Sequence, residues 1–441
     1  MKRSIVIHGH FYQPPRDDPW TGTIPLESSA APFHDWNERI ERECYAPVAP
    51  SLASLSFDFG PTLLAWLEGH APETYAAVLA ADRVSVARYD GHGSAIAMPY
   101  HHTILPLSPR RDKVTEVRWG IADFRRRFAR EPEGMWLPET AVDDETLDVL
   151  AAAGIRFTIL APHQVERAPA LGLPSWYRTA AGRRIALFLY DGPISHDVAF
   201  GPLVRDAAAW TQRLTAAPSD LVAVATDGET YGHHHKGGDV VLARVLEQLA
   251  GRSDMRVENF AAFLDRHPPQ EDIRLVAPSS WSCPHGVERW RAECGCRVAP
   301  ERGMHQRWRA PLRAALDWLA AELHAVFERE GKPLFGDPWA ARDAYDPVRP
   351  NPPHPPNPLL ELERHALRMF TSCGWFFDDI AGIESVIVLR SAARAIELAG
   401  AFPPPGAAWL ETGLLERLAL APSNDPAVGS GRELYLKRVK R

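Results

Sequence analysis

The stretch Leu221-Val-Ala-Val-Ala-Thr-Asp227-Gly228-Glu229 contains the pattern that decides the fold. Its first five residues are apolar and partly β-branched, which is typical of a strand buried on both faces of a parallel sheet. The run ends in a carboxylate followed by a glycine, so Asp227 is expected in the turn at the carboxyl end of that strand. A helix is predicted to follow over residues 239–250 and to end at Gly251.

The same order of strand, polar turn and helix recurs through about the first 270 residues. Strands are predicted at residues 3–7, 52–59, 95–98, 134–137, 156–160, 184–190 and 221–225, and helices at residues 113–130, 144–153 and 239–250. Residues 8–15 are expected to form the loop after the first strand. This alternation favours an α/β fold with a parallel sheet, in which active sites lie at the carboxyl ends of the strands.

The last part of the chain, from about residue 275, is predicted to be helical, with helices over residues 308–329, 359–370 and 383–398. Residues 346–358 carry seven prolines and are expected to form an extended loop or linker. A chain of 441 residues is too long for one ordinary domain. We therefore expect a catalytic domain over residues 1–270 and a helical domain over residues 271–441.

The composition argues against several classes of protein. The formal net charge is −7 and the basic residues form no sustained stripe, which argues against a nucleic-acid partner. No stretch approaches the roughly 20 apolar residues that a membrane span requires, and the apolar run after Met1-Lys2-Arg3 is too short for a signal peptide. Five cysteines in a chain of this length do not make a disulfide scaffold, so a soluble cytoplasmic protein is expected.

Two carboxylates follow predicted strands directly. In Gly134-Met-Trp-Leu-Pro-Glu139, the proline would hold Glu139 rigidly at the rim of the sheet, but the segment alone equally suits a glutamate in the first turn of a helix. Asp227 precedes Gly228 and Glu229, and three histidines follow at residues 233–235. The alternatives there are an ordinary polar turn, or a metal site that would need further, distant ligands.

Two other segments carry histidines. In His8-Gly-His10, the spacing of two puts both imidazoles on one side of an extended chain, where they could bind metal or sugar hydroxyls, or form a pair by chance. A second group consists of Cys283, His285, Cys294 and Cys296. These four side chains could ligate zinc, but their spacings match no zinc knuckle or ribbon, which favours free thiols or a local redox pair.

Five blocks of this sequence resemble, in order, those of glycoside hydrolase family 57, and most closely those of its subgroup with a C-terminal helical domain of undefined function. The blocks are His8-Gly-His10 to Gln13-Pro14, Tyr100-His-His102-Thr-Ile-Leu-Pro106, Trp136-Leu-Pro-Glu139, Asp227-Gly-Glu229 to Gly232, and Trp281 to His285-Gly286. The likeness to the subgroup extends through residues 375–379 almost to the C-terminus. The segment before Phe57 is shorter than the family pattern suggests, which leaves the number of sugar subsites open.

The resemblance implies a distorted seven-stranded (β/α) barrel followed by an α-helical C-terminal domain that completes the substrate cleft. It implies a retaining α-glucan-active glycosidase or transglycosylase of the α-amylase, 4-α-glucanotransferase or branching-enzyme type. Glu139 matches the family's nucleophile and Asp227 its acid/base. The candidate substrate-binding residues are His8, His10, Gln13, His102, Trp136, Glu229, Trp281, His285 and Trp290.

The expected partner is thus an α-glucan oligosaccharide or polysaccharide, with no metal and no cofactor. Two alternatives come from other functional classes. One is a metal-dependent hydrolase resembling a carbohydrate deacetylase, whose barrel and rim histidines would look similar. The other is a glucan-binding protein without catalysis.

Overall fold

The computed structural model describes residues 2–347 and 356–440, and within it the chain forms two compact units. The first unit comprises Met1–Gln13, Leu26–Pro99 and Gly120–Ala277, and the second comprises Pro14–Pro25, Tyr100–Trp119 and Pro278–Arg441. The expected domain boundary at residue 270 stays a prediction. The segments at residues 14–25 and 100–119 belong to the second unit.

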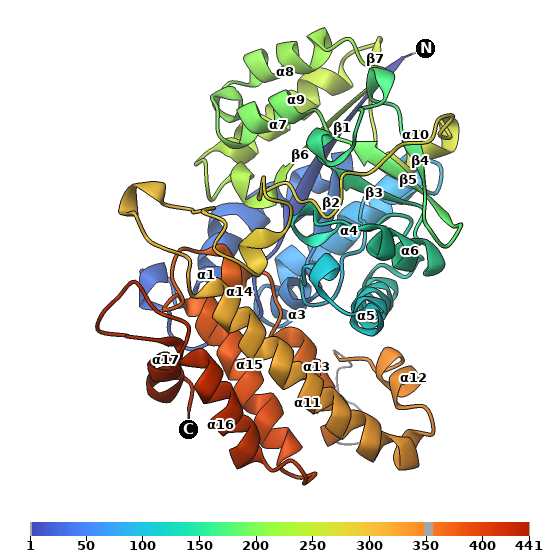
Figure 1. The fold of residues 1–441 in the computed structure, drawn as a ribbon. Helices are drawn as coiled ribbons and strands as arrows, with labels where there is room; N and C mark the ends of the chain where they lie inside the picture. The colour runs from blue at the N-terminus through green and yellow to red at the C-terminus, as the bar shows by residue number, and fades with distance from the viewer. Residues whose placement is uncertain (1, 348–355, 441) are drawn as a thin grey trace. The chain divides into compact units, whose positions relative to one another are not determined.

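Parallel strands form the centre of the first unit (Figure 1). They are β1 (Arg3–Phe11), β2 (Ser56–Phe59), β3 (Phe157–Leu160), β5 (Arg184–Leu189), β6 (Leu221–Asp227) and β7 (Met255–Val257), and β4 (Ser175–Arg178) is antiparallel to β5. β1 pairs with β2, with β6 and, through its first residues, with β7. β3 pairs with β5.

Two short segments join these strands into a ring. Parallel bridges connect Phe57 with Ala95, Ala97 with Met135, and Gly134 with Phe157. A backbone hydrogen bond from Asp191 N to Ala223 O (2.6 Å) connects the end of β5 to β6. The order is therefore β1, β2, residues 95–97, residues 134–135, β3, β5 and β6. The predicted distorted seven-stranded barrel is confirmed, and part of its distortion is that two members are held by isolated bridges.

All seven predicted strand positions carry one of these members, but two boundary predictions are wrong. The strand predicted over residues 52–59 begins only at Ser56, because Ala49–Ser54 forms a 3-10 helix. Residues 8–11 continue β1 and do not belong to a loop. The sequence suggested a loop because polar residues rarely lie inside a buried strand. In the structure, His8 and His10 are buried in β1 because side chains of β2 give them hydrogen-bond partners.

Helices surround the strands of the first unit. They are α1 (Trp36–Ile40), α2 (Ala46–Val48), α3 (Pro61–His70), α4 (Pro72–Arg88), the end of α5 (Arg110–Phe128), α6 (Asp144–Ala152), α7 (Gly192–Ala199), α8 (Ala207–Ala216), α9 (Gly238–Ala250) and α10 (Phe260–Arg266). Helix α6 is followed by Gly154 at φ +87°, a left-handed conformation that favours glycine after a helix end.

The second unit is helical, as predicted. Its helices are the start of α5, then α11 (Arg309–Phe335), α12 (Pro338–Asp343), α13 (Pro358–Arg368), α14 (Cys373–Phe376), α15 (Ile383–Ala399), α16 (Ala407–Leu418) and α17 (Gly431–Arg438). Helices α11, α13, α15 and α16 pack side by side (Figure 1). The predicted proline-rich loop falls largely on residues 348–355, which lie outside the described residues. Nowhere in the described ranges is a helix both long and apolar enough to cross a bilayer.

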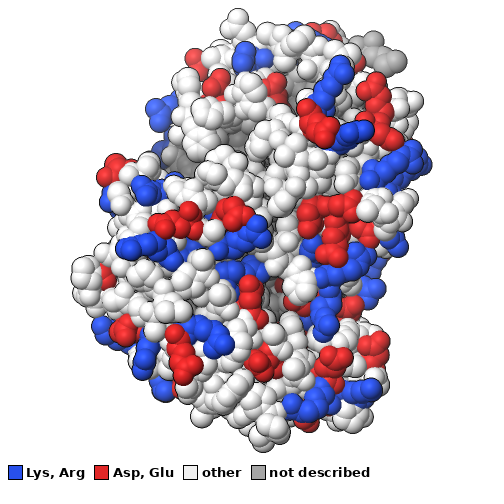
Figure 2. Space-filling view, viewed as in Figure 1, with Lys and Arg blue, Asp and Glu red and all other residues white. Residues whose placement is uncertain are grey.

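Charged side chains of both signs are interspersed on the surface. On the face drawn in Figure 2, Lys and Arg lie beside Asp and Glu in many places. Exposed pairs such as Arg178 with Asp272 (Nε to Oδ2, 2.7 Å) and Arg252 with Asp254 (Nη2 to Oδ2, 2.8 Å) are examples of this mixing. Mixed charge is typical of a surface kept soluble and not specialised for a polyanion.

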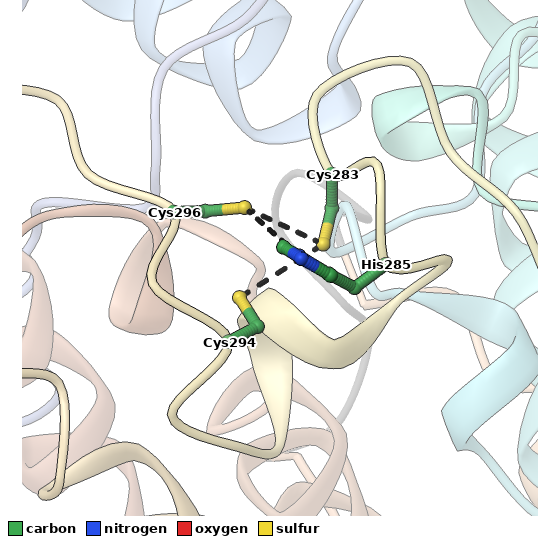
Figure 3. Close-up of side chains that lie close together, drawn as sticks. All are labelled: Cys283, His285, Cys294 and Cys296. Atoms are coloured by element: carbon green, nitrogen blue, oxygen red, sulfur yellow. Dashed lines mark hydrogen bonds between the residues drawn. The ribbon is translucent and has the colours of Figure 1, made fainter.

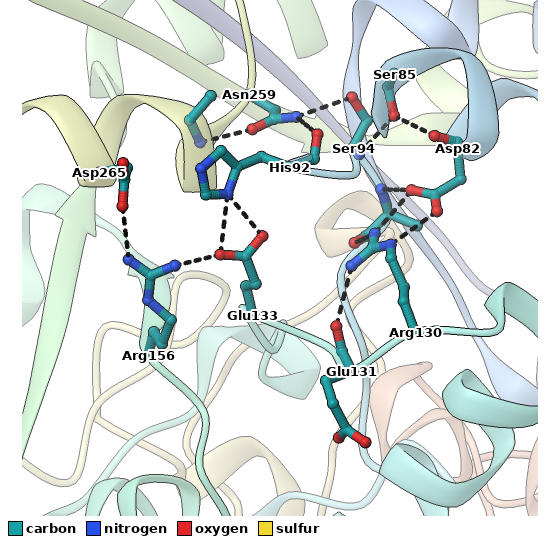
Figure 4. A network of polar contacts seen from close by, with 12 residues as sticks. Asp82, Ser85, His92, Ser94, Arg130, Glu131, Glu133, Arg156, Asn259 and Asp265 are labelled. Carbon is teal, nitrogen blue, oxygen red and sulfur yellow. Dashed lines mark hydrogen bonds and ion pairs between the residues drawn. The ribbon is translucent and has the colours of Figure 1, made fainter. Parts of the chain in front are cut away.

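A polar network lies at the amino ends of the strands, at the end of the barrel opposite Asp227 (Figure 4). His92 Nδ1 contacts Glu133 Oε1 (2.9 Å), and Glu133 also pairs with Arg156, which directly precedes β3. Asn259 Nδ2 donates to the carbonyl oxygen of His92 (2.9 Å). In (β/α) barrels this end carries stabilising contacts, whereas the carboxyl ends carry the active site.

Asp82 and Arg130 hold the third barrel segment in place (Figure 4). Arg130 forms two hydrogen bonds to the carboxylate of Asp82, Nε to Oδ2 at 2.9 Å and Nη2 to Oδ1 at 2.7 Å. The same Nη2 donates to Ala95 O (2.7 Å), and Ala95 N donates to Asp82 Oδ1 (2.8 Å). The pair therefore fixes both backbone polar groups of the residue that bridges to β2.

We expect Asp82→Asn to lower the free energy of unfolding by about 3 kcal/mol, because it leaves the mostly buried Arg130 charge without its carboxylate. Urea denaturation followed by circular dichroism measures the change. Asp254→Asn is the matched control, since it breaks a solvent-exposed pair and should leave the midpoint nearly unchanged. Equal effects of the two substitutions would contradict the role given to Asp82.

Candidate active site

Three neighbouring strands place Asp58, His10 and Asp227 in one row. In the register of the sheet, His10 of β1 lies opposite Asp58 of β2 on one side and opposite Asp227 of β6 on the other. His8 lies two residues earlier, opposite Ser56. Since alternate residues of a strand face the same side, both imidazoles reach the same carboxylate, as the spacing predicted.

Asp58 binds both histidines. His10 Nδ1 lies 2.8 Å from Asp58 Oδ2 and His8 Nε2 lies 3.1 Å from Oδ1, while His8 Nδ1 lies 3.1 Å from Ser56 Oγ. Burial disfavours the charged form of His10, but the negative charges of Asp58, Asp227 and Glu229 outweigh it and raise the pKa of His10 to about 9. His10 is therefore an imidazolium at neutral pH.

His8 differs from His10 in its charge. Burial is the largest effect on it and lowers its pKa, although the hydrogen bond to Asp58 acts in the opposite direction. The two imidazoles are stacked against the indole of Trp136, with ring centroids 4.7 Å and 5.2 Å away. Trp136 is fully buried, so it packs in the core instead of offering a ring face to a sugar.

Asp227 is the last residue of β6, and the short 3-10 helix η9 (Gly228–Tyr231) begins directly after it. Gly228 is needed here because a Cβ would lie 2.2 Å from the ring of Phe11. Part of Asp227 is exposed, but protein atoms packed around its carboxyl group remove much of its hydration. This burial, with the charges of Glu229 and Glu139, overcomes the effect of His10 and raises the pKa of Asp227 to about 7.

Glu139 lies in a strained turn after the fourth barrel segment. It belongs to η5 (Pro138–Thr140) and has φ +57° and ψ 20°, a left-handed conformation that costs a residue with a side chain about 1–2 kcal/mol. The Gln164 side chain holds this turn, because its Nε2 donates to Thr140 O and its Oε1 accepts from Thr140 Oγ1, both at 2.8 Å. Glu139 is not the cap of the next helix, since Asp143 caps α6.

The two carboxyl groups come from distant parts of the sequence and lie near enough to interact. The charge of Glu139 is one of the causes of the raised pKa of Asp227. Both groups lie at the carboxyl ends of barrel segments, Asp227 as the last residue of β6 and Glu139 in the turn after the fourth segment.

Hydrogen bonds from two tyrosines hold the carboxylate of Glu229. Its Oε1 accepts hydrogen bonds from Tyr45 Oη (2.6 Å) and from Tyr12 N (3.2 Å), and the side chain of Gln13 is hydrogen-bonded to Tyr45 in turn. Burial is the main cause that raises the pKa of Glu229. Glu229 and Gln13 therefore belong to one chain of hydrogen bonds that joins the end of β1 to the segment after Asp227.

The three histidines after Glu229 do not converge on Asp227. His233 Nδ1 lies 2.5 Å from Glu43 Oε2, and His235 Nε2 donates to Ala199 O (2.8 Å). In the part of the chain that the structure describes, the grouping of three or more residues suited to a metal ion lies elsewhere, at Cys283, and does not include Asp227. The alternative of a metal site at Asp227 with residues 233–235 therefore has no support.

Four other candidates lie in the second unit. His102 has φ +56°, and its Nδ1 lies 2.6 Å from Ser372 Oγ. Trp281 is partly exposed, whereas Trp290 is only 1% exposed and offers no ring face to a sugar. His285 lies within a group of three cysteines.

The sequence reading missed several residues of the site. Asp58 is the most important of them, and the sequence marks it only weakly, because it takes a polar position in the alternating pattern Ser56-Phe-Asp58-Phe. Tyr45 and Gln164 act through contacts with residues distant in the sequence, and no local pattern marks them. Tyr190 also lies near Asp227, whose charge adds to burial in raising the pKa of the Tyr190 hydroxyl.

Two family models match the chain. Residues 85–275 match the model described as "Glycosyl hydrolase family 57", and residues 304–351 and 357–441 match the one described as "Domain of unknown function (DUF3536)". Among curated relatives, the 4-alpha-glucanotransferase of Thermococcus litoralis is 22% identical over 64% of this chain and 43% of the relative. The alpha-amylase of Pyrococcus horikoshii is 23% identical over 64% and 44%. The chain spans less than half the length of these relatives.

Solved structures share the fold. The exo-type maltose-forming amylase of Pyrococcus sp. ST04 is 17% identical and has a TM-score of 0.74, covering 95% of this chain and 83% of that one. A branching enzyme of Thermococcus kodakaraensis is 14% identical, with a TM-score of 0.64 and coverage of 95% and 94%. The class is therefore that of distorted (β/α) barrels with a helical second part. Within this class, residues 85–275 of the chain are similar to glycoside hydrolase family 57.

Proposed function

We propose that the chain is a retaining glycosidase or transglycosylase that acts on α-glucans, with Glu139 as the nucleophile and Asp227 as the acid/base. This proposal is carried by the position of both carboxyl groups at the carboxyl ends of barrel segments, where burial and the charges of Glu229 and Glu139 raise the pKa of Asp227 to about 7. Retaining glycosidases need one ionised and one protonated carboxyl group beside the scissile bond. The match of residues 85–275 to the family model and the named relatives support an α-glucan as the substrate.

In the first step, a carboxylate oxygen of Glu139 forms a bond to the anomeric carbon of the sugar. The bond from that carbon to the glycosidic oxygen breaks, and its electron pair goes to the oxygen, which takes the proton of Asp227. The result is a glycosyl ester of Glu139, a released chain end and an ionised Asp227.

In the second step, Asp227 removes a proton from water or from a sugar hydroxyl. The oxygen so activated attacks the anomeric carbon from the face opposite Glu139, and the ester bond breaks with its electron pair returning to Glu139. Two inversions at one carbon give net retention. Water as acceptor gives hydrolysis, and a sugar hydroxyl gives transfer.

The effect of the Glu139 charge on the pKa of Asp227 suits both steps of the reaction. While Glu139 is ionised, its negative charge helps Asp227 keep the proton that the leaving group needs. Once Glu139 is esterified, that charge is gone and the pKa of Asp227 should fall, which makes it a carboxylate base. The imidazolium of His10, held by Asp58, favours the ionised form of Asp227 in this second state.

We assign the remaining candidates according to their surroundings. His8 and Trp136 are positioning residues because His8 binds Asp58 and Trp136 packs against His10. Gln13 and Glu229 are positioning residues because both are hydrogen-bonded to Tyr45. His10 lies directly opposite Asp227 in the register of the sheet. His102 and Trp281 are kept as candidates for sugar contact, and Trp290 is not, because it is buried.

The test is product analysis on maltooligosaccharides and amylose. We expect the first product formed by the wild-type protein to have the α configuration in proton NMR, and Glu139→Gln to form none. Products both longer and shorter than the substrate indicate transfer, and shorter products alone indicate hydrolysis. A β-configured first product would contradict the retaining mechanism.

Two outcomes would favour the alternatives. Binding of oligosaccharides without turnover, unchanged in Glu139→Gln, would indicate a glucan-binding protein. Release of acetate from an acetylated oligosaccharide, with glycosidic bonds intact, would indicate a deacetylase. For the compartment we propose the cytoplasm, which the content of five cysteines in 441 residues supports, because so few do not make a disulfide scaffold.

A further inference from the structure

Three cysteines and one histidine of the second unit point toward one centre (Figure 3). Cys283 Sγ lies 3.7 Å from Cys296 Sγ and 4.0 Å from Cys294 Sγ, and Cys296 Sγ lies 3.7 Å from His285 Nδ1. All four ligand atoms lie within 4.8 Å of one another. We call these four side chains the cysteine cluster.

Three of the six spacings between these atoms match the edges of a zinc coordination tetrahedron, and the others are no longer than 4.8 Å. Zinc binds thiolate sulfur at about 2.3 Å and imidazole nitrogen at about 2.0–2.1 Å. A regular tetrahedron with those bond lengths has sulfur–sulfur edges of about 3.8 Å and sulfur–nitrogen edges of about 3.6 Å. The three distances between named atoms agree with these edges to within a few tenths of an ångström.

The backbone around the cluster is shaped to bring the four side chains together. Gly286 and Gly295 have φ of +86° and +85°, which are left-handed conformations that glycine adopts without strain. At Gly286 a Cβ would also lie 2.6 Å from Pro278 O. Ser280 Oγ donates to the Gly286 carbonyl (2.6 Å), and Gly286 N donates to Cys283 O (3.1 Å), which closes the first turn.

A buried cation lies next to the sulfur atoms. Arg309, the first residue of α11, is 0% exposed, and its Nη1 lies 3.9 Å from Cys294 Sγ and 3.0 Å from Cys296 O. Its Nη2 donates to Phe377 O (3.2 Å). Three thiolates and a neutral imidazole around Zn²⁺ carry a net charge of about −1. The guanidinium of Arg309 would balance that charge, and a buried cation needs such a partner.

The cluster fits zinc better than a redox pair. A disulfide would use two of the three sulfur atoms and leave a third thiol and an imidazole with no role in it. A structural zinc site uses all four groups and leaves no open coordination position. The stretch from Pro278 to Trp308 contains only the short 3-10 helices η10 (Glu288–Trp290) and η11 (Pro300–Arg302), so it has few regular backbone hydrogen bonds to hold it.

We propose that Cys283, His285, Cys294 and Cys296 bind one zinc ion in a closed, four-coordinate site that fixes the segment before α11. None of its four ligands belongs to the proposed catalytic pair, and its role is structural. It also changes the reading of His285, whose Nδ1 is a zinc ligand in this proposal and not a sugar contact. The sequence alone favoured free thiols because the ligand spacing fits no familiar zinc motif.

The first experiment measures metal in the untagged full chain, purified without chelator from cells grown with added zinc. We expect one zinc per chain by elemental analysis, released when an organomercurial blocks the thiols. After exchange, Co²⁺ should give the visible absorption of a tetrahedral site together with thiolate charge-transfer bands. Metal well below one per chain, or a protein mass two hydrogens low from a disulfide within the cluster, would overturn the proposal.

The second experiment compares two cysteine variants. Cys296→Ser should weaken zinc binding by more than about a hundred-fold, because even the loss of a second-shell partner costs about 10–100-fold. Cys373→Ser removes a partly exposed cysteine outside the cluster and should keep one zinc per chain. Retention of full zinc content by Cys296→Ser would contradict the site. If that variant does not fold, the Co²⁺ spectrum of the wild-type protein still decides.

The catalytic proposal and the zinc proposal can fail independently. Glu139→Gln should bind zinc as the wild-type protein does, because Glu139 lies outside the cluster. A chain with zinc but no α-glucan activity would leave the zinc site standing and remove the catalytic proposal. A chain with α-glucan activity but no zinc would leave the catalytic proposal standing and remove the zinc site.

Discussion

Glu139→Gln is expected to lower turnover of maltooligosaccharides at least about a thousand-fold, because an amide oxygen is too weak a nucleophile to form the glycosyl ester. The side chain keeps its size, and the hydrogen bonds between Thr140 and Gln164 that hold the turn are untouched. The melting temperature should therefore change little. The measurement is the initial rate of product formation, and more than a tenth of the wild-type rate in the variant would refute the assignment.

Azide tests whether Glu139 acts as the nucleophile and not as the acid/base. In Glu139→Ala, azide can enter the space of the missing carboxylate and attack the anomeric carbon of an α-glucosyl fluoride directly. The product of that single inversion is a β-glucosyl azide. In Asp227→Ala, azide would instead attack the ester of Glu139 and give the α-azide. An α-azide from Glu139→Ala would show that the two roles are exchanged.

Asp227→Asn is expected to lower turnover of maltooligosaccharides by about a hundred- to ten-thousand-fold, the range typical of general acid–base catalysis. Formation of the ester from α-glucosyl fluoride should be far less affected, because fluoride leaves without taking a proton. Single-turnover kinetics separates the two effects. Equal losses on both substrates would contradict the role of Asp227 as the acid.

The pH dependence gives a second test of the same residue. The first step needs protonated Asp227, and the pKa of Asp227 is about 7, so kcat/KM on maltooligosaccharides should be high below pH 7 and fall as the pH rises through it. In Asp227→Asn this alkaline decline should be absent. Glu229→Gln is the matched control. It should lose less activity than Asp227→Asn, because Glu229 acts through Tyr12 and Tyr45.

Much of the barrel could be predicted because its strands carry local signals. The run from Leu221 to Ala225 is apolar and bounded by polar turns, and the same holds for residues 184–190. The weak segments at residues 95–98 and 134–137 were found for the same reason, although each forms isolated bridges. Pairing order is set by contacts across the sheet, so the position of β1 between β2 and β6 could not be read from any one segment.

The candidate site was predictable only in part. Glu139 and Asp227 stand out because each ends a strand and matches a family block, but the left-handed turn at Glu139 depends on Gln164, 25 residues away. Asp58 was missed because one acidic residue in a strand gives no sign that two histidines of another strand will neutralise it. The sequence did not favour zinc at the cysteine cluster, because the spacing of ligands along the chain does not predict their distances in space when two glycines bend the chain.

The central place of β1 has a consequence for how the protein is made. Ser4 pairs with Leu221, more than 200 residues later in the chain. At ribosomal speeds of about 5–20 residues per second, the first strand emerges on the order of ten to forty seconds before that partner. During this interval the apolar run Ile5-Val6-Ile7 lacks one of its neighbours, and such an unpaired edge invites association with other nascent chains. Cotranslational shielding by a chaperone should therefore raise the yield of folded protein.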